Sequence, residues 1–215
     1  MPEFATRDPD DPSFWDERFA VGFTPWDEAR TPPALLRFLE RERGRLGRRV
    51  LIPGCGSGHE VAALDAAGFQ VLAIDFAAAA IALARRVLSP ALAERCLRQA
   101  DFFRFEDELD EPLARPPFDW IYERAFLPAL APARWPQWAA RVAMLLAPGG
   151  RLAGLFFVDA ALPERRSGPP FVASRGELDT LLGVAFTCSE AAPLPAAETL
   201  PVFAGRLQWM VWQRR

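Results

Sequence analysis

Residues 49–58 of this chain read RVLIPGCGSG, and residues 70–75 read QVLAID. The first stretch is a short apolar run that ends in three glycines at alternate positions, which is typical of a buried strand followed by a sharp turn. Residues 58–67 have a helical pattern, and the second apolar run ends on the acid Asp75. An acid placed there accepts hydrogen bonds from ribose hydroxyls, so the two stretches predict a βαβ unit for a ribose-containing ligand.

The alternation of strands and helices continues to the end of the chain. Further helices are predicted at 77–88, 133–146 and 174–182, and further strands at 95–101, 118–123, 151–158, 183–190 and 202–213. This order favours an α/β fold, with a mainly parallel sheet of seven strands and helices on both faces. No linker divides the chain, so residues 1–215 are expected to form one domain. Residues 76–78 offer no capping side chain, so the helix after Asp75 is expected to have a poorly fixed start.

Charge and composition exclude several classes of protein. The formal net charge is −3, and the one basic run, residues 41–49, is interrupted by Glu42 and is interpreted as the last turn of a helix. Nucleic-acid binders usually show a basic face, so no nucleic-acid partner is expected. No apolar run approaches the roughly 20 residues of a membrane span, and the acidic N-terminal residues do not resemble a secretion signal. We therefore expect a cytoplasmic protein with no membrane partner.

The inventory of reactive side chains is small. Cys55, Cys96 and Cys188 form no CxxC pair, and His59 is the only histidine, so no metal site is expected. The chain contains no lysine, which excludes Schiff-base catalysis and a P-loop. Cys55 could act as a nucleophile at a helix start, but a small buried residue is the favoured interpretation, because His59 is the only neighbouring base. Five tryptophans are expected in the core, namely Trp120, Trp135, Trp138, Trp209 and Trp212.

Two cofactors compete for the glycine turn. The NAD fingerprint G-x-G-x-x-G/A needs glycine or alanine at position 59, where this chain has His59. The spacing G-x-G-x-G at 54–58 is the form used around S-adenosylmethionine (SAM), whose methionyl part lacks a pyrophosphate. The turn therefore favours SAM, and an NAD-dependent oxidoreductase stays as the alternative.

Several motifs occur in order along residues 14–185. They are FW at 14–15, TPWD at 24–27, VLIPGCGSG at 50–58, ADFF at 100–103, IYERAFLPAL at 121–130, PGGRL at 148–152 and GPPF at 168–171. In this combination the chain resembles the thiopurine methyltransferase family, including its halide/thiol methyltransferase branch. The resemblance implies the Rossmann-like class I methyltransferase fold, with an antiparallel last strand, and SAM as the cofactor.

The resemblance also implies a role for each matching residue. The cofactor would be held by a lid of Trp15, Phe19 and Trp26 within an N-terminal arm (1–32), by Gly54, Cys55 and Gly56, by Asp75 and Phe76 at the ribose, by Asp101 and Phe102 at the adenine, and by Arg124. Arg124 would be the catalytic residue beside the methyl donor. The substrate wall would come from Phe126, Leu127, Arg165, Arg166 and Phe171. An aromatic lid suits a sulfonium, because a cation is attracted to the face of an aromatic ring.

Simpler interpretations remain open for these residues. Without the resemblance, Trp15 and Trp26 would be packing residues that anchor the arm, and Arg124 would form an ion pair with Glu123.

Methyl transfer from a sulfonium is an in-line displacement, in which the enzyme mainly aligns the reacting atoms and excludes water. A thiol of low pKa or a halide arrives as an anion and needs no base, which fits the lack of an evident catalytic His, Lys or Tyr. We therefore expect a monomeric SAM-dependent methyltransferase that acts on a small soft nucleophile, of thiol, thiopurine, sulfide or halide type. A SAM-binding protein without catalysis is the third hypothesis.

Overall fold

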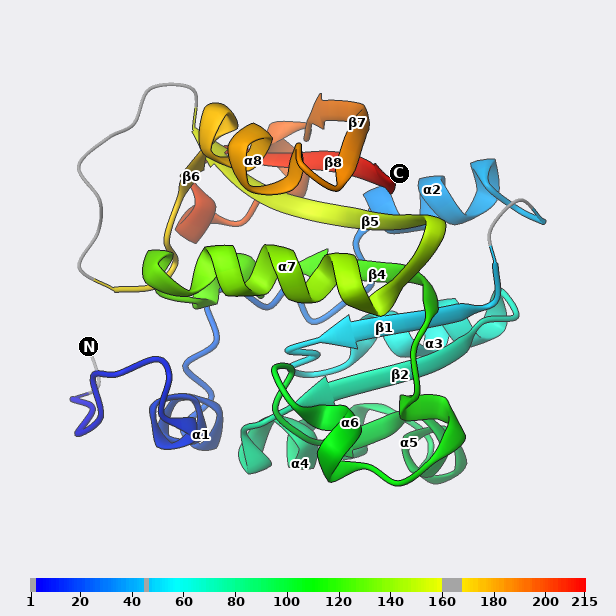
Figure 1. The fold of residues 1–215 in the computed structure, drawn as a ribbon. Helices are drawn as coiled ribbons and strands as arrows, with labels where there is room; N and C mark the ends of the chain where they lie inside the picture. The colour runs from blue at the N-terminus through cyan, green and yellow to red at the C-terminus, as the bar shows by residue number, and fades with distance from the viewer. Residues whose placement is uncertain (1–2, 45–46, 160–167) are drawn as a thin grey trace.

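The computed structural model describes residues 3–44, 47–159 and 168–215. Its centre is a sheet with the strand order β3-β2-β1-β4-β5-β8-β7. Figure 1 shows this sheet from β7 at the top to β2 in the lower half of the view. The strands are β1 (Arg49–Pro53), β2 (Gln70–Asp75), β3 (Leu97–Gln99), β4 (Phe118–Arg124), β5 (Leu146–Asp159), β7 (Phe186–Pro193) and β8 (Leu207–Arg214), and the short β6 (Ala173–Ser174) pairs with β5. Strands β1 to β5 pair in parallel, and β8 runs antiparallel to both β5 and β7. The mainly parallel sheet with an antiparallel last strand is confirmed.

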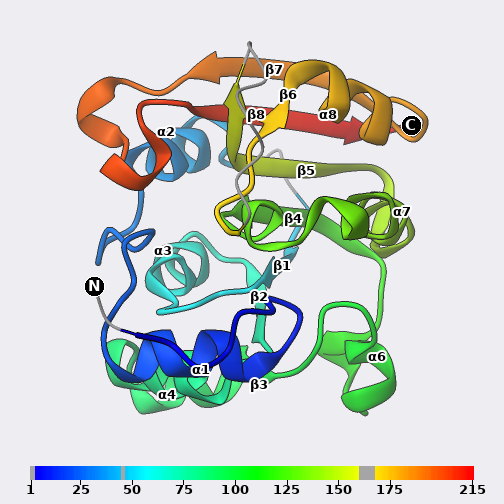
Figure 2. The same ribbon diagram turned by 90° about the vertical axis from the view of Figure 1, so that its left-hand side faces the viewer.

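Helices cover both faces of the sheet, as Figure 2 shows. One face carries α6 (Phe105–Glu108), α7 (Trp135–Leu145) and α8 (Arg175–Leu182), and the other carries α2 (Pro33–Arg41), α3 (His59–Ala66), α4 (Ala78–Val87) and α5 (Pro90–Cys96). Helix α1 (Pro12–Ala20) lies beside α4 at one edge. Because side chains of a strand alternate between faces, Leu51 packs in the core with Trp138, whereas Val50 and Ile52 pack in the core with Phe38.

The five tryptophans expected in the core are all buried. Trp120 illustrates their packing. Its ring lies 5.2 Å from Phe38 of α2 and 5.6 Å from Phe69, measured between ring centroids. Large aromatic side chains on the strands therefore hold the helices of this face against the sheet.

The main difference from the sequence prediction is α5. Residues 95–101 were expected to form a strand, but a helix occupies Pro90–Cys96 and leaves only Leu97–Gln99 for β3. Ser89 and Pro90 end α4, as expected, and they also begin α5. The Ser89 hydroxyl accepts the Leu92 N–H, and proline is favoured at the first helical position.

Several other boundaries also differ from the prediction. Strand β5 begins at Leu146, where the predicted helix was expected to end and not at residue 151, because Leu146 already pairs with Phe118 of β4. Strand β7 spans Phe186–Pro193, three residues later than the predicted strand at 183–190. Helix α7 begins at Trp135, after a 3-10 turn at Pro132–Arg134. Strand β8 begins at Leu207, after a 3-10 turn at Pro201–Phe203. The basic run 41–49 was expected to be the last turn of a helix. In the structure, α2 ends at Arg41, the first residue of the run, and β1 begins at Arg49, the last residue of the run.

The strand order places a switch point at β1. The chain proceeds from β1 to β2 and β3 on one side, and it returns on the other side of β1 with β4 and β5. In open α/β sheets, ligands bind beyond the carboxyl ends of the strands at such a point. Along the ranges that the structure describes, no helix has the length and apolar character needed to cross a bilayer.

Gly154 provides a test of the contact between β4 and β5. It is paired with Glu123, and a Cβ added at Gly154 would lie 1.9 Å from the carbonyl oxygen of Glu123. Gly154→Ala is expected to lower the free energy of unfolding by about 2 kcal/mol or more, because the paired strands must move apart. Urea denaturation measures this change.

Gly176→Ala is the matched control. In the described part of the chain, a Cβ added at Gly176 would have open space within 4 Å outside its own helix backbone and chain neighbours. This change in α8 is expected to be neutral or to stabilise by up to about 1 kcal/mol through helix propensity. Equal stabilities of the two variants would contradict the packing argument.

Candidate active site

A cavity of about 560 Å³ opens at the carboxyl ends of β1, β2, β3 and β4. Its size is within the range of small-molecule sites. The sequence-predicted residues that line it are Trp15, Phe19, Trp26, Gly54, Cys55, Gly56, Asp75, Phe76, Asp101, Phe102, Arg124 and Phe126. Within the described residues, no group of three or more His, Cys, Asp or Glu side chains could hold a metal ion. The fold therefore brings the arm and four strand ends to one small-molecule cavity.

The glycine turn lies close to two aromatic rings. Gly54 has φ +58° and Gly56 has φ +52°, in the left-handed region that favours glycine. A Cβ on Gly54 would lie 2.5 Å from Phe126 Cδ2, and one on Gly56 would lie 3.6 Å from Phe19 Cζ. Glycine is therefore required at position 54 both by its backbone angles and by the ring above it.

Asp75 joins the glycine turn to the start of α4. Its Oδ2 accepts the Gly56 N–H and its Oδ1 accepts the Ala77 N–H, each at 3.0 Å. Burial raises the pKa of Asp75 to about 6, against the opposing effect of these two hydrogen bonds. The side chain thus has a structural role that the sequence did not indicate.

Cys55 is buried in the same turn. Burial, together with the charges of Asp75 and Glu60, raises the pKa of its thiol well above the ordinary value. The thiol therefore stays protonated and is a poor nucleophile, in agreement with the favoured interpretation of a small buried residue.

The aromatic residues of the arm form one cluster. The rings of Trp15 and Phe19 meet that of Trp26 nearly edge to face, at centroid distances of 5.5 and 5.9 Å. All three line the cavity, so they are wall residues as well as packing residues.

The arm also supplies the helix cap that residues 76–78 lack. As far as the described residues show, no side chain caps α4 from its own N-cap position, Ala77. Asp16 of α1 instead accepts the Ala79 N–H at 2.8 Å. Its distance along the chain explains why the local sequence gave no signal of this contact.

Asp101 and Phe102 follow β3 and line the cavity. Asp101 Oδ1 accepts the Phe103 N–H at 2.9 Å, and its Oδ2 lies 3.6 Å from Arg104 Nε. Phe102 is buried and meets the ring of Phe126 edge to face, at 5.1 Å. The two phenylalanines form an apolar wall.

Arg124 lies between two acids that sequence reasoning missed. Its Nη1 is hydrogen-bonded to Glu60 Oε1, and its Nη2 lies 3.9 Å from Glu28 Oε1. Burial alone lowers the pKa of Arg124, but Glu60, Tyr122 and Glu28 together hold it above its ordinary value. The guanidinium therefore stays charged. The sequence did contain a signal for Glu60, because this acid stands in the first turn of a predicted helix, directly after the glycine turn.

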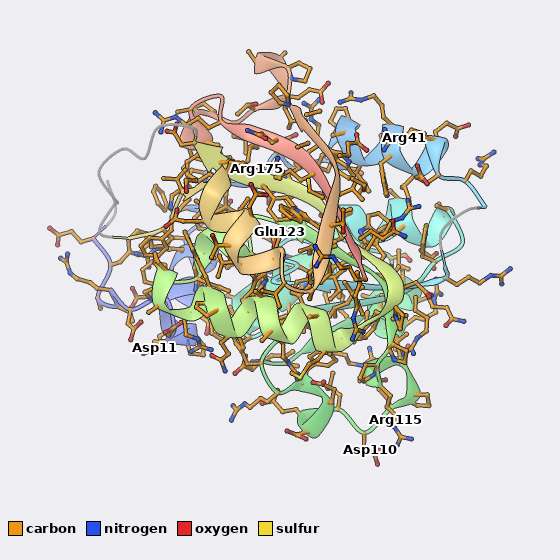
Figure 3. All side chains as sticks on the ribbon, turned by 45° about the horizontal axis from the view of Figure 1, so that its top comes forward. Asp11, Arg41, Asp110, Arg115, Glu123 and Arg175 are labelled. Atoms are coloured by element: carbon orange, nitrogen blue, oxygen red, sulfur yellow. The ribbon has the colours of Figure 1, made fainter. Side chains whose placement is uncertain are left out.

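The ion pair between Arg124 and Glu123 that the sequence left open does not form. Glu123 is fully buried, and it lies in the middle of the molecule in Figure 3, whereas Asp110 and Arg115 lie at its periphery. Its Oε1 accepts the N–H groups of Phe126 and Leu127, at 3.0 and 2.9 Å. Glu123 therefore fixes the turn after β4 that places Phe126 against Gly54. Burial raises the pKa of Glu123 to about 8.

Two described residues that were expected in the substrate wall do not line the cavity. Among the described residues that line the cavity, Leu127 and Phe171 are absent. Leu127 is buried in the main core, and Phe171 packs against that core while its N–H bonds to the Pro128 carbonyl oxygen. Apolar packing thus takes both side chains away from the cavity. Arg165 and Arg166 lie outside the described residues.

The chain is similar in sequence and in structure to known methyltransferases. The family model described as Thiopurine S-methyltransferase matches residues 10–215. Probable thiol methyltransferase 2 of Arabidopsis thaliana is 32% identical over 78% of this chain and 70% of that protein. Thiocyanate methyltransferase 1 of Brassica oleracea is 31% identical over 80% of this chain and 73% of that protein. The solved structure of magnesium protoporphyrin IX methyltransferase from Synechocystis PCC 6803 with bound SAM has a TM-score of 0.70 at 15% identity, over 99% of this chain and 100% of that one. This likeness confirms the class I methyltransferase fold.

The buried Glu123 predicts a dependence of stability on pH. Its folded pKa of about 8 lies above the ordinary value of 4.5, so its contribution to stability is lost as the pH rises toward 8. Between pH 6 and 8 the wild type is expected to lose about 2 kcal/mol of unfolding free energy from this group. Asp75, with a pKa of about 6, titrates mainly below that window.

Glu123→Gln is the matching variant, because the amide oxygen still accepts the two N–H groups and cannot ionise. Its unfolding free energy should change less over the same window, as measured by urea denaturation at each pH. Parallel profiles of the two proteins would show that Glu123 does not titrate there.

Proposed function

The chain belongs to the thiopurine S-methyltransferase family and is a SAM-dependent methyltransferase, and we propose that the cavity described above holds the cofactor and receives a small soft nucleophile. The family match confirms the resemblance found in the sequence and disfavours an NAD-dependent oxidoreductase. We propose sulfur as the most favoured acceptor atom, because the relatives are named for thiols, thiocyanate and thiopurines.

One observation carries this proposal. Gly54, Asp75, Asp101 and Arg124 follow or end four different strands, and they line a single cavity under the aromatic residues of the arm. The residues present fit SAM, because a backbone without Cβ atoms, an acid for ribose hydroxyls and aromatic rings for a sulfonium are all in place.

Each part of the cavity has a role in this proposal. The turn at Gly54–Gly56 binds the methionyl end through its backbone, and Asp75 accepts from the ribose hydroxyls. Asp101 accepts from the adenine amino group, while Phe102 packs on the ring. Trp15, Phe19 and Trp26 close over the sulfonium and exclude water. When bound, SAM supplies an electrophilic methyl group.

The residues around the reacting atoms mainly position and shield them. Arg124 is held by Glu60 and Glu28, so its side chain presents a fixed surface to the acceptor. Phe126 is fixed by Glu123 and forms part of the cavity wall. Alignment and exclusion of water are the chief requirements of a displacement at a methyl carbon.

The partner and the compartment belong to the same proposal. We propose a monomeric, cytoplasmic enzyme that binds a small molecule and no nucleic acid. A sequence pI of about 5.4 supports the last point, and three free cysteines support a reducing compartment.

Transfer of labelled methyl from SAM tests the function directly. The acceptor panel is thiophenol, 6-mercaptopurine, sulfide, iodide, a catechol and a carboxylic acid. Turnover confined to the sulfur and halide acceptors is the expected result. Turnover on the oxygen acceptors alone would overturn the choice of acceptor, and tight SAM binding with no turnover on any acceptor would favour a SAM-binding protein without catalysis.

Asp75→Ala tests the proposed ribose contact. The variant is expected to bind S-adenosylhomocysteine at least about tenfold more weakly by calorimetry, or about 1.4 kcal/mol. Asp75 also holds the N–H groups of Gly56 and Ala77, so thermal unfolding without ligand must show that the variant is folded. An unchanged affinity for S-adenosylhomocysteine would show that Asp75 does not contact the ribose.

A further inference from the structure

We propose that Glu28 controls which acceptor binds at the end of the cavity that contains Arg124, called here the acceptor end. Its charge favours an uncharged thiol over an anion such as thiocyanate or iodide. The inference rests on the proposed function, because it concerns the acceptor of the same methyl transfer. The charges and the unpartnered polar atoms around Arg124 support it.

Two carboxylates already face the guanidinium of Arg124. Its Nη1 is hydrogen-bonded to Glu60, and its Nη2 lies 3.9 Å from Glu28 Oε1. The side chains of Glu60 and Glu28 are each 6% exposed and that of Arg124 is 13% exposed, so salt screens these charges little. The single positive charge of Arg124 is therefore more than balanced by its two neighbours.

The other charged groups nearby do not reverse this excess. Asp27 lines the cavity, and in the described part of the chain its charged partner is His59, whose Nε2 lies 3.8 Å from Asp27 Oδ1. Glu28 Oε2 also meets Arg30 Nε at 3.3 Å, but the Arg30 side chain is 57% exposed and water screens its charge. Glu60 and Asp27 line the cavity, whereas Glu28 does not line it and acts on an anion there through its charge beside Arg124, so carboxylates outnumber the guanidinium at this end.

Tyr122 adds a neutral hydroxyl at the same place. It is fully buried and lines the cavity, and neither its Oη nor Arg124 Nη2 has a hydrogen-bond partner among the described residues. Burial, followed by the charge of Glu60, raises the pKa of Tyr122, so the hydroxyl stays neutral. A buried polar atom without a partner is costly, and a small polar acceptor beside it would remove that cost.

A thiol that arrives with its proton adds no charge to this end of the cavity. Its sulfur lone pair forms the new bond to the methyl carbon, while the bond between that carbon and the cofactor sulfur breaks and its electron pair stays on the cofactor sulfur. The thiol proton passes to Asp27, which contacts no arginine within the described residues. Thiocyanate and iodide bring a negative charge and have no proton to give.

The test is Glu28→Gln, an isosteric change that removes one negative charge. Glu28→Asp keeps the charge, and Glu40→Gln removes a charge from a side chain that is 76% exposed on α2. One readout is the dissociation constant of thiocyanate, measured by calorimetry with and without S-adenosylhomocysteine. The other is kcat/KM for thiocyanate relative to 2-mercaptoethanol, which is uncharged at neutral pH.

Wild type is expected to prefer the thiol. Glu28→Gln should bind thiocyanate at least about tenfold more tightly and shift the kcat/KM ratio toward it by a similar factor. Glu40→Gln should stay near wild type, and Glu28→Asp, which keeps the charge, should keep the preference for the thiol. The inference is overturned if Glu28→Gln keeps the wild-type thiocyanate affinity and ratio, or if wild type prefers thiocyanate.

The readouts separate this inference from the proposed function. Absence of cofactor binding, or of turnover on any acceptor, would count against the proposed function, and thiocyanate titration of the free protein would still decide the role of Glu28. Should Glu28→Gln fail to fold, the wild-type preference between the two acceptors decides.

Discussion

The buried carboxylate of Asp75 is the contact on which the cavity depends. It accepts one N–H from the turn after β1 and one from the start of α4, so it joins two segments that lead away from the sheet in different directions. Those two hydrogen bonds offset part of the cost of burying the charge, although burial still raises the pKa of Asp75 to about 6. The left-handed turn at Gly54–Gly56 and the position of α4 both follow from this side chain.

The arm is built on the same anchor and completes the cavity. Asp16 caps α4 at Ala79, two residues beyond the N–H that Asp75 accepts, and Figure 2 shows α1 lying along α4 as a result. The arm then brings its tryptophans to the cavity wall and Glu28 beside Arg124. The aromatic wall and the charge at the acceptor end are therefore set by one segment of chain.

Strand β4 presents functionally different side chains on its two faces, because consecutive side chains of a strand point in opposite directions. Tyr122 and Arg124 share the face that meets α3 and the arm, where they set the polarity of the cavity. Glu123 faces the opposite way and holds the turn that presents Phe126. The same alternation explains why Arg124 pairs with Glu60 and Glu28 rather than with the acid next to it in sequence.

The sequence by itself determined the βαβ unit at 49–75, the family and part of the cavity lining, because strand patterning, glycine turns and an acid at a strand end are local chemistry. It missed α5, since a Ser-Pro pair that ends one helix can also begin the next. The tertiary structure alone decided the cap from Asp16, the two acids on Arg124 and the burial of Leu127 and Phe171. These contacts join segments that lie far apart in the chain, and their energies depend on distances and burial that no local spacing encodes.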